Sequence, residues 1–217
     1  MCNTYNLRGR PKDVVAIFDA DLAEPEVDFA YESIHPDYSA PVIRRTAEGK
    51  RELVMMRWGF PLASDQKDKR PVVNARNVHS DYWKPYHGVE HRCLVPATSF
   101  AEWTPQPNPA TGKKETIWFG LNDNRSPFAF AGLWCSWQGV RGTKAKPVEG
   151  LHLLYAFLTT RPNDIVKPVH SQSMPVILRS REEWQAWLTL PIREALKLQQ
   201  PLPEDAIKIV ATGSRSD

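Results

Sequence analysis

Apolar and polar residues alternate over most of the chain, in short runs separated by polar and proline-rich segments. Alternation with a period of two, with β-branched and aromatic residues at the apolar positions, is typical of strands. The stretch TPQPNPATGKKE (104–115) is predicted to be a polar hairpin loop between two strands. The pattern predicts antiparallel strands at ELVMMRWGF (52–60), RPVVNAR (70–76), RCLVPATSFAEW (92–103), ETIWFGL (115–121), PFAFAGLWCSW (127–137), GLHLLYAFLTT (150–160), MPVILR (174–179) and AIKIVAT (206–212).

Helical periodicity is confined to fewer places. PKDVVAIFDADL (11–22) begins with a proline, which suits the first turn of a helix. Four of its apolar residues are expected on one helix face: Val14, Val15, Phe18 and Leu22.

A second helix is predicted at SREEWQAWL (180–188). Ser180 and Glu183 have the spacing of a capping box, ahead of the apolar pair Trp184 and Trp187. Pro191 is expected to break or kink this helix, and IREALKLQQ (192–200) is predicted to be a short further one.

These elements predict an α+β fold with a mostly antiparallel, barrel-like β-sheet core and flanking helices. We expect one domain over residues 1–217, because this length can bury a core without disulfides. A tail from about 212 to 217 is predicted to be disordered.

Composition mainly excludes classes of protein. Hydrophobic residues at 41% and charged residues at 24% are ordinary globular values. The net charge of +3 and the pI near 8.7 give only a mild preference for acidic partners. The eight tryptophans offer either core volume or stacking faces for bases. No signal-peptide pattern and no run of ~18 apolar residues occurs, so we expect a cytoplasmic protein without a membrane partner.

The cysteines and histidines do not predict a metal centre. Cys2, Cys93 and Cys135 form no CxxC pair, which argues against a disulfide framework and a cysteine-rich zinc site. His87 and His91 lie in HGVEH, where the glutamate stands beside the second histidine and not in the HExxH position. We expect no metal and no other cofactor.

Three predicted strands or strand ends carry polar groups within otherwise apolar runs. Asn74 and Arg76 alternate with apolar residues and are predicted to share one strand face. Glu102 stands between Ala101 and Trp103, and His170 precedes MPVIL. Singly, each of these residues has an ordinary structural explanation. Jointly, an amide, a guanidinium, a carboxylate and an imidazole predict an acid/base and anion-binding site.

Cys2 follows the initiator methionine directly. One interpretation is a small residue tolerated at a disordered terminus. The other is that removal of Met1 leaves an α-amine and a thiol on adjacent carbons, a pair of nucleophiles that an internal cysteine does not have.

The motifs Cys2, WGF (58–60), NAR (74–76), CLVPA to FAEW (93–103) and His170 to MPVIL occur in the order of one known family. On these residues the chain resembles the SRAP family of SOS-response-associated peptidase-like, abasic-site processing proteins. The resemblance extends from Cys2 to about Trp187. Family members commonly begin MCGR and carry H-x-R-M-P, where this chain has MCNT and HSQSMP.

The resemblance implies a role for each motif residue. Family members bind single-stranded DNA, or a junction of single and double strand, and attach to an abasic site through the mature N-terminal cysteine. Cys2 is accordingly expected to be the nucleophile, Glu102 the acid/base carboxylate and His170 its partner. Asn74 and Arg76 are expected to contact DNA near the lesion, with Asn74 also in the catalytic group.

Further DNA contacts are expected beside these motifs. Single-strand recognition requires a cationic track and aromatic platforms. The residues predicted to supply them are Arg57, Trp58, Trp103 and Arg161, together with Arg76.

The predicted function is that of an abasic-site sensor in DNA repair and the SOS response. After loss of Met1, by a peptidase-like self-removal, Cys2 would form a covalent thiazolidine crosslink that shields the lesion, with lyase or hydrolase chemistry. We expect a monomer that associates with the nucleoid when bound to DNA. Two alternatives stay open: an N-terminal-nucleophile cysteine amidohydrolase or peptidase, and a non-covalent module that binds single-stranded nucleic acid.

Overall fold

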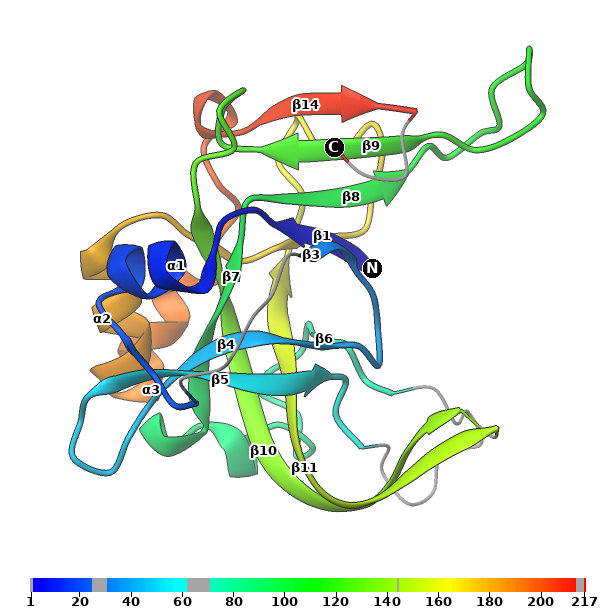
Figure 1. The fold of residues 1–217 in the computed structure, drawn as a ribbon. Coiled ribbons are helices and arrows are strands. Elements are labelled where there is room, and N and C mark those ends of the chain that lie inside the picture. Colours follow the sequence, from blue (N-terminus) through cyan, green and yellow to red (C-terminus); the bar gives the residue numbers. More distant parts are fainter. Residues whose placement is uncertain (1, 25–30, 62–70, 144, 214–216) are drawn as a thin grey trace.

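The structure is a computed structural model that describes residues 2–24, 31–61, 71–143, 145–213 and 217 (Figure 1). Its helices are α1 (Pro11–Phe18), α2 (Arg181–Thr189) and α3 (Ile192–Ala195), with 3₁₀ turns η1 (Lys84–Tyr86), η2 (Val89–His91), η3 (Leu196–Leu198) and η4 (Glu204–Ala206). Its strands are β1 (Thr4–Leu7), β2 (Asp21–Leu22), β3 (Tyr31–Ile34), β4 (Ser39–Arg45), β5 (Arg51–Trp58), β6 (Asn74–Ala75), β7 (Arg92–Ala97), β8 (Ser99–Trp103), β9 (Thr116–Gly120), β10 (Phe128–Thr143), β11 (Lys146–Thr160), β12 (Met174–Pro175), β13 (Ile177–Leu178) and β14 (Lys208–Thr212).

The strands form two sheets. A five-stranded sheet has the order β14-β9-β8-β1-β3, with antiparallel pairing throughout. A nine-stranded sheet runs β12-β11-β10-β7-β4-β5-β2, with β13 against β10 and β6 against β11. Because β5 also pairs with β11, in parallel, the strands β11, β10, β7, β4 and β5 close into a ring. The predicted α+β fold with a mostly antiparallel, barrel-like core is confirmed.

The predicted β-rich run 92–103 forms two strands. The run 92–103 divides at Thr98, where the chain passes from β7 in the nine-stranded sheet to β8 in the five-stranded sheet. The Thr98 N–H donates to the carbonyl of Asn6 at 2.8 Å, and its hydroxyl lies 3.2 Å from the same oxygen. This crossing connects the two sheets through continuous chain and brings β8 beside β1.

Aromatic residues fill the space between the sheets. Tyr5 on β1 packs edge-on against Trp58 and Phe130, with ring centroids 5.3 and 5.5 Å apart. Trp58 stacks on Phe157 at 5.1 Å, and the hydroxyls of Tyr5 and Tyr155 lie 2.6 Å apart. Aromatic pairs of this kind contribute ~0.5–1.5 kcal/mol each beyond area burial, so they fix β1 firmly against the barrel.

The first helix is shorter than predicted. It begins at Pro11 as expected, and Val14 and Phe18 are buried. Asp19 then takes a left-handed conformation with a φ of 53°, and its N–H donates to the carbonyl of Val15. This turn ends α1, so Leu22 lies in β2 and not on the helix face.

The second helix has the predicted capping box. The Ser180 hydroxyl accepts from the Glu183 N–H, and the Glu183 carboxylate accepts from the Ser180 N–H, both at 3.2 Å. Pro191 separates α2 from α3, as expected. The indole of Trp187 donates to the carbonyl of Cys93 at 2.9 Å, which attaches α2 to β7.

The loop 104–115 connects antiparallel strands β8 and β9, as predicted. The β10–β11 hairpin reaches further than the sequence pattern indicates and extends from the body as a two-stranded ribbon (Figure 1). Among the described residues, no helix combines the length and apolar character that crossing a membrane requires. The predicted disorder of the tail falls largely on 214–216, which lie outside the described residues, as does Met1.

Candidate active site

Cys2 lies two positions before the start of β1 and is 1% exposed, so it does not occupy a loose terminus. The side-chain amide of Asn74, on β6, donates to the carbonyl of Cys2 at 3.0 Å. The thiol donates to the carbonyl of Thr4 at 3.5 Å. Burial raises the pKa of the Cys2 thiol well above its ordinary value, and the negative charge of Glu102 raises it further. The thiol is therefore uncharged at neutral pH.

Glu102 lies on β8, which pairs with β1. Side chains alternate along a strand, so Glu102 points to the same side as the buried Phe100, and it is only 4% exposed. Among the described residues, its Oε1 atom has no hydrogen-bond partner. Burial raises the pKa of the carboxyl group to about 7, against the opposing effect of the positive N-terminus. A buried carboxyl group without a full set of partners destabilises a fold, which is typical of groups that perform chemistry.

His170 lies in the segment between β11 and β12. Its Nδ1 atom is 3.1 Å from the backbone nitrogen of Ser173 and 2.9 Å from the carbonyl oxygen of the same residue, which fixes the ring. Burial lowers the pKa of the imidazole, and the positive N-terminus lowers it further. His170 and Glu102 thus both experience the charge at the N-terminus, and His170 is predominantly neutral at pH 7.

Arg76 connects β6 with the His170 segment. One guanidinium nitrogen donates to the carbonyls of Thr160 and Gln172, both at 2.8 Å. Strand β6 ends at Ala75, with Asn74 buried and Arg76 exposed, so the predicted shared strand face does not extend to Arg76. The arginine holds the segment that carries His170, and as a residue it is exposed.

Two of the predicted DNA contacts have other roles. Trp58 is fully buried, and its indole donates to the carbonyl of Val73 at 3.0 Å. It offers no face to a base, so its predicted stacking role is wrong: the side chain of this strand residue points into the barrel. Arg57, its neighbour on β5, is half-buried and donates to the backbone carbonyl of Asp37 at 2.6 Å and to its carboxylate at 3.2 Å.

The other two predicted contacts are accessible. Trp103 directly follows Glu102 at the end of β8 and is 54% exposed. Arg161 directly follows β11 and is exposed. An aromatic face and a cation therefore lie at the ends of the strands that position Glu102 and the His170 segment.

A further imidazole near the N-terminus escaped the sequence analysis. The Nδ1 atom of His35, after β3, lies 3.1 Å from the hydroxyl of Thr4. No local pattern indicates this contact, because the two residues are 31 positions apart and meet only through the pairing of β1 with β3. Thr4 is one of the positions at which this chain differs from the MCGR start.

The histidines of HGVEH bind backbone carbonyls. His87 Nε2 is 2.8 Å from the carbonyl of Val78, and His91 Nδ1 is 3.2 Å from that of Trp134. Within the described part of the chain, no three His, Cys, Asp or Glu side chains lie close enough to hold a metal ion.

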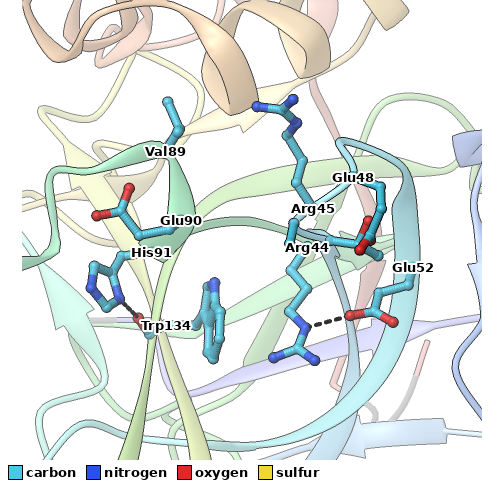
Figure 2. Close-up of a pocket in the computed structure, with 10 residues that line it drawn as sticks. Arg44, Arg45, Glu48, Glu52, Val89, Glu90, His91 and Trp134 are labelled. Atoms are coloured by element: carbon cyan, nitrogen blue, oxygen red, sulfur yellow. Dashed lines mark hydrogen bonds and ion pairs between the residues drawn. The ribbon is translucent and has the colours of Figure 1, made fainter.

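A hollow of about 680 Å³ lies between the β4–β5 hairpin, η2 and β10, and none of the residues around Cys2 lines it (Figure 2). Arg44 donates to Glu52 at 2.8 Å, and its guanidinium lies 4.6 Å from the ring centroid of Trp134. Glu48 and Glu90 also line the hollow. Because three carboxylates balance its arginines, this hollow does not favour a polyanion.

Comparison with known proteins gives the following relatives. A sequence model of the family described as SOS response associated peptidase (SRAP) matches residues 1–215. Abasic site processing protein YoqW of Bacillus subtilis (strain 168) is 31% identical over 201 residues, covering 87% of this chain and 80% of that relative. Abasic site processing protein YobE of the same organism is 30% identical over 199 residues, covering 85% and 81%.

Solved structures share the fold. A crystal structure of a protein from Bordetella bronchiseptica has a TM-score of 0.71 at 21% identity and covers 98% of both chains. One from Bacteroides thetaiotaomicron has a TM-score of 0.74 at 19% identity and covers 95% of this chain and 90% of the other. The two sheets and their connections are thus an arrangement that other chains also adopt.

Proposed function

The chain belongs to the SOS response associated peptidase (SRAP) family, and on this premise we propose that it processes abasic sites in single-stranded DNA by forming a covalent crosslink through Cys2. The proposal is supported by the hydrogen bond from Asn74 to the Cys2 carbonyl, by the effect of the Glu102 charge on the Cys2 thiol, and by the effect of the N-terminal charge on both Glu102 and His170. Relatives of the chain are named abasic site processing proteins.

The proposed chemistry requires a free α-amine on Cys2, and therefore removal of Met1. While Met1 is attached, the nitrogen of Cys2 is an amide and cannot form an imine. The family's peptidase description fits a self-removal of this one residue. Asn74 contacts the carbonyl of Cys2, which keeps the residue in place without occupying its nitrogen or its sulfur.

The raised pKa of the thiol sets the order of the two bond-forming steps. An α-amine with an ordinary pKa of ~7.7–8.0 is partly neutral at pH 7, whereas the buried thiol remains protonated. The amine attacks the aldehyde of the opened abasic sugar first, and one water leaves as the imine forms. The thiol then adds across the C=N bond: a C–S bond forms and the proton passes to nitrogen. Effective molarities of ~10⁵ M or more favour closure of this five-membered thiazolidine.

Glu102 and His170 supply the proton transfers. With a pKa of about 7, a substantial fraction of Glu102 is protonated near neutral pH and can donate to the ring oxygen of the cyclic sugar as it opens. His170, with its lowered pKa, is largely neutral and can accept a proton as the amine adds. The two groups therefore differ in proton occupancy at the same pH, as a general acid and a general base require.

Exposed residues near these groups are suited to a single strand. Arg76 and Arg161 are cations that can contact phosphates, and Trp103 offers a face for stacking. Phosphate and stacking contacts do not discriminate between sequences, which suits recognition of a lesion that occurs at any position.

The amidohydrolase alternative requires the thiol as first nucleophile toward an amide. A neutral, buried thiol is a poor one, because the thiolate is the reactive form. Release of ammonia from glutamine by the mature protein would favour that alternative. A non-covalent binding module would lose its DNA on denaturation.

The test uses mature protein, verified by intact mass to begin at Cys2, and a single strand that carries one abasic site. We expect a protein–DNA adduct that survives heating in detergent, and none with the undamaged strand or with protein that retains Met1. An adduct of equal yield with Met1 verifiably in place would contradict the proposed role of the α-amine.

A further inference from the structure

A second hollow of about 680 Å³ lies between the segment that follows β6 and the α3–η3 region. Its charged and titratable lining consists of His79, Lys84, His87, Arg193 and Lys197. Among the described residues, no carboxylate lines it, in contrast to the hollow of Figure 2, to which Glu48, Glu52 and Glu90 contribute. An excess of cations around a concave surface attracts anions.

The carboxylates nearest to these cations form only weak pairs with them. Lys84 contacts Asp81 at 2.7 Å, and Lys197 contacts Glu194 at 2.5 Å, each three residues away along the chain. Asp81 and Glu194 are 97% and 51% exposed, and exposed pairs of this type contribute ~0–1 kcal/mol. Arg193 has no ion pair among the residues that the structure describes. The cations are therefore available to an anionic ligand.

The same hollow has an apolar side. Ile192 and Leu196 line it and are half-buried, one turn apart in α3 and η3. Cations beside an aliphatic surface match a ligand in which phosphate groups alternate with sugars. A free inorganic anion would leave the aliphatic side without a contact.

The hollow is connected to the candidate active site through Gln199 and Arg76. His79, which lines the hollow, follows Arg76 by three positions. Gln200, which also lines it, follows Gln199 in the chain. The side-chain amide of Gln199 donates to the carbonyls of Arg76 and Thr159, at 3.1 and 3.0 Å. Arg76 in turn holds the His170 segment through Gln172. A strand that contacts Arg76 can therefore continue over Gln199 into the hollow.

We infer that this basic hollow is a second DNA-binding site, which holds the sugar–phosphate backbone of a strand whose abasic site lies at Cys2. The inference rests on the proposed function, because it takes the bound strand to be DNA. It adds an anchor beyond the contacts next to the lesion, and it assigns binding to residues that no catalytic step uses.

The test measures binding to an undamaged single strand of about 20 nucleotides by fluorescence anisotropy over a range of salt concentrations. Arg193→Gln with Lys197→Gln removes two cations. For each phosphate that the variant no longer neutralises, the slope of log affinity against log salt should fall by ~0.7, and affinity at low salt should fall by ~3–10-fold. The matched control, Lys12→Gln with Lys50→Gln, removes two exposed cations that do not line the hollow and should keep the wild-type slope.

Arg193→Glu alone distinguishes charge from local structure. It should weaken binding more than Arg193→Gln, while both variants unfold at the wild-type temperature, because the side chain is exposed. Equal slopes for the double variant and its control would overturn the inference even if abasic strands are crosslinked normally. A reduced slope without any adduct on abasic strands would support the hollow as a site and contradict the proposed chemistry instead.

Discussion

Two carboxylates, one in each sheet, have different environments. Glu52 on β5 receives a hydrogen bond from Arg44 at 2.8 Å at the margin of the hollow in Figure 2. Glu102 on β8 is 4% exposed, has an oxygen without a partner among the described residues and has a pKa raised to about 7 by burial. Glu52 belongs to a partly buried ion pair, in which the side chains of Arg44 and Glu52 are 24% and 20% exposed. The buried Glu102 oxygen without a partner makes the fold less stable than an apolar residue would, and the proposed role beside Cys2 is a reason for the chain to keep it.

Two buried cysteines, Cys2 and Cys93, also differ in their surroundings. Cys2 and Cys93 are both buried, and burial raises both pKa values. Only Cys2 is also affected by a carboxylate, since burial is the sole cause of the shift at Cys93. Burial alone therefore does not distinguish the two cysteines, whereas the carboxylate neighbour and the position next to the N-terminus do.

The largest effect is expected from the thiols. Cys2→Ala should eliminate the adduct that survives denaturation, because an imine without the neighbouring sulfur hydrolyses. Borohydride should still trap that imine. Cys93→Ala, a control within the core, should crosslink like wild type at a temperature where it is folded. A denaturing gel with an abasic strand measures the adduct formed by each variant. A stable adduct with Cys2→Ala would contradict the proposed role of the Cys2 thiol.

The next effect concerns the rate. Glu102→Gln should slow adduct formation by ~10²–10⁴-fold, the usual contribution of a general acid. Its affinity for undamaged strands should stay near wild type. Glu52→Gln, the paired counterpart, should not change the rate. A quenched time course gives the rates and anisotropy gives the affinities. If affinity and rate fall together for Glu102→Gln, the residue supports the structure of the DNA-binding surface, and its assignment as a general acid is wrong.

The smallest effect is on stability, and its sign depends on pH. The pKa of Glu102 rises from an ordinary 4.5 to about 7 in the folded protein, so the folded state retains a proton that the unfolded state releases. Stability should therefore decline as pH rises from 4.5 to 7. Glutamine does not titrate, so the free energy of unfolding of Glu102→Gln should rise by ~2–3 kcal/mol relative to that of wild type when the pH increases from 5 to 8. Glu52→Gln removes one charge of a partly buried ion pair and should lower the free energy of unfolding at both pH values. Urea unfolding at pH 5 and pH 8 measures these free energies. If the difference between Glu102→Gln and wild type is the same at both pH values, Glu102 is well solvated and the prediction is wrong.

Much of the fold could be predicted from local patterns. The capping box of Ser180 and Glu183 and the loop 104–115 depend on neighbouring residues, and both are confirmed. The far ends of β10 and β11 were missed, because glycine, threonine, lysine and proline near residues 139–150 are typical of turns. There the long ladder of β10 with β11 decides the conformation, and not the propensity of single residues.

The candidate site was predictable in its members but not in its geometry. Asn74, Glu102 and His170 stand out as polar groups within apolar runs, and Cys2 stands out by its position after Met1. The family resemblance then assigns a role to each of them, since no spacing rule connects four segments this far apart. Trp58 shows the limit of such reasoning. A tryptophan beside an arginine suggests a binding surface, and alternation along β5 does not reveal which of the two side chains points into the barrel. The packing of Trp58 on Phe157 shows that the tryptophan side chain points into the barrel.

The hydrogen bond from Asn74 ends on the carbonyl oxygen of Cys2. Of the functional groups of that residue, the carbonyl is the one that keeps its bonds through every proposed stage: nitrogen loses methionine and gains a carbon, and sulfur gains a carbon. The same hydrogen bond can therefore persist in the precursor, in the mature protein and in the crosslinked product. Asn74 would thus hold the backbone of Cys2 in one position while maturation and crosslinking change the substituents on its nitrogen and sulfur.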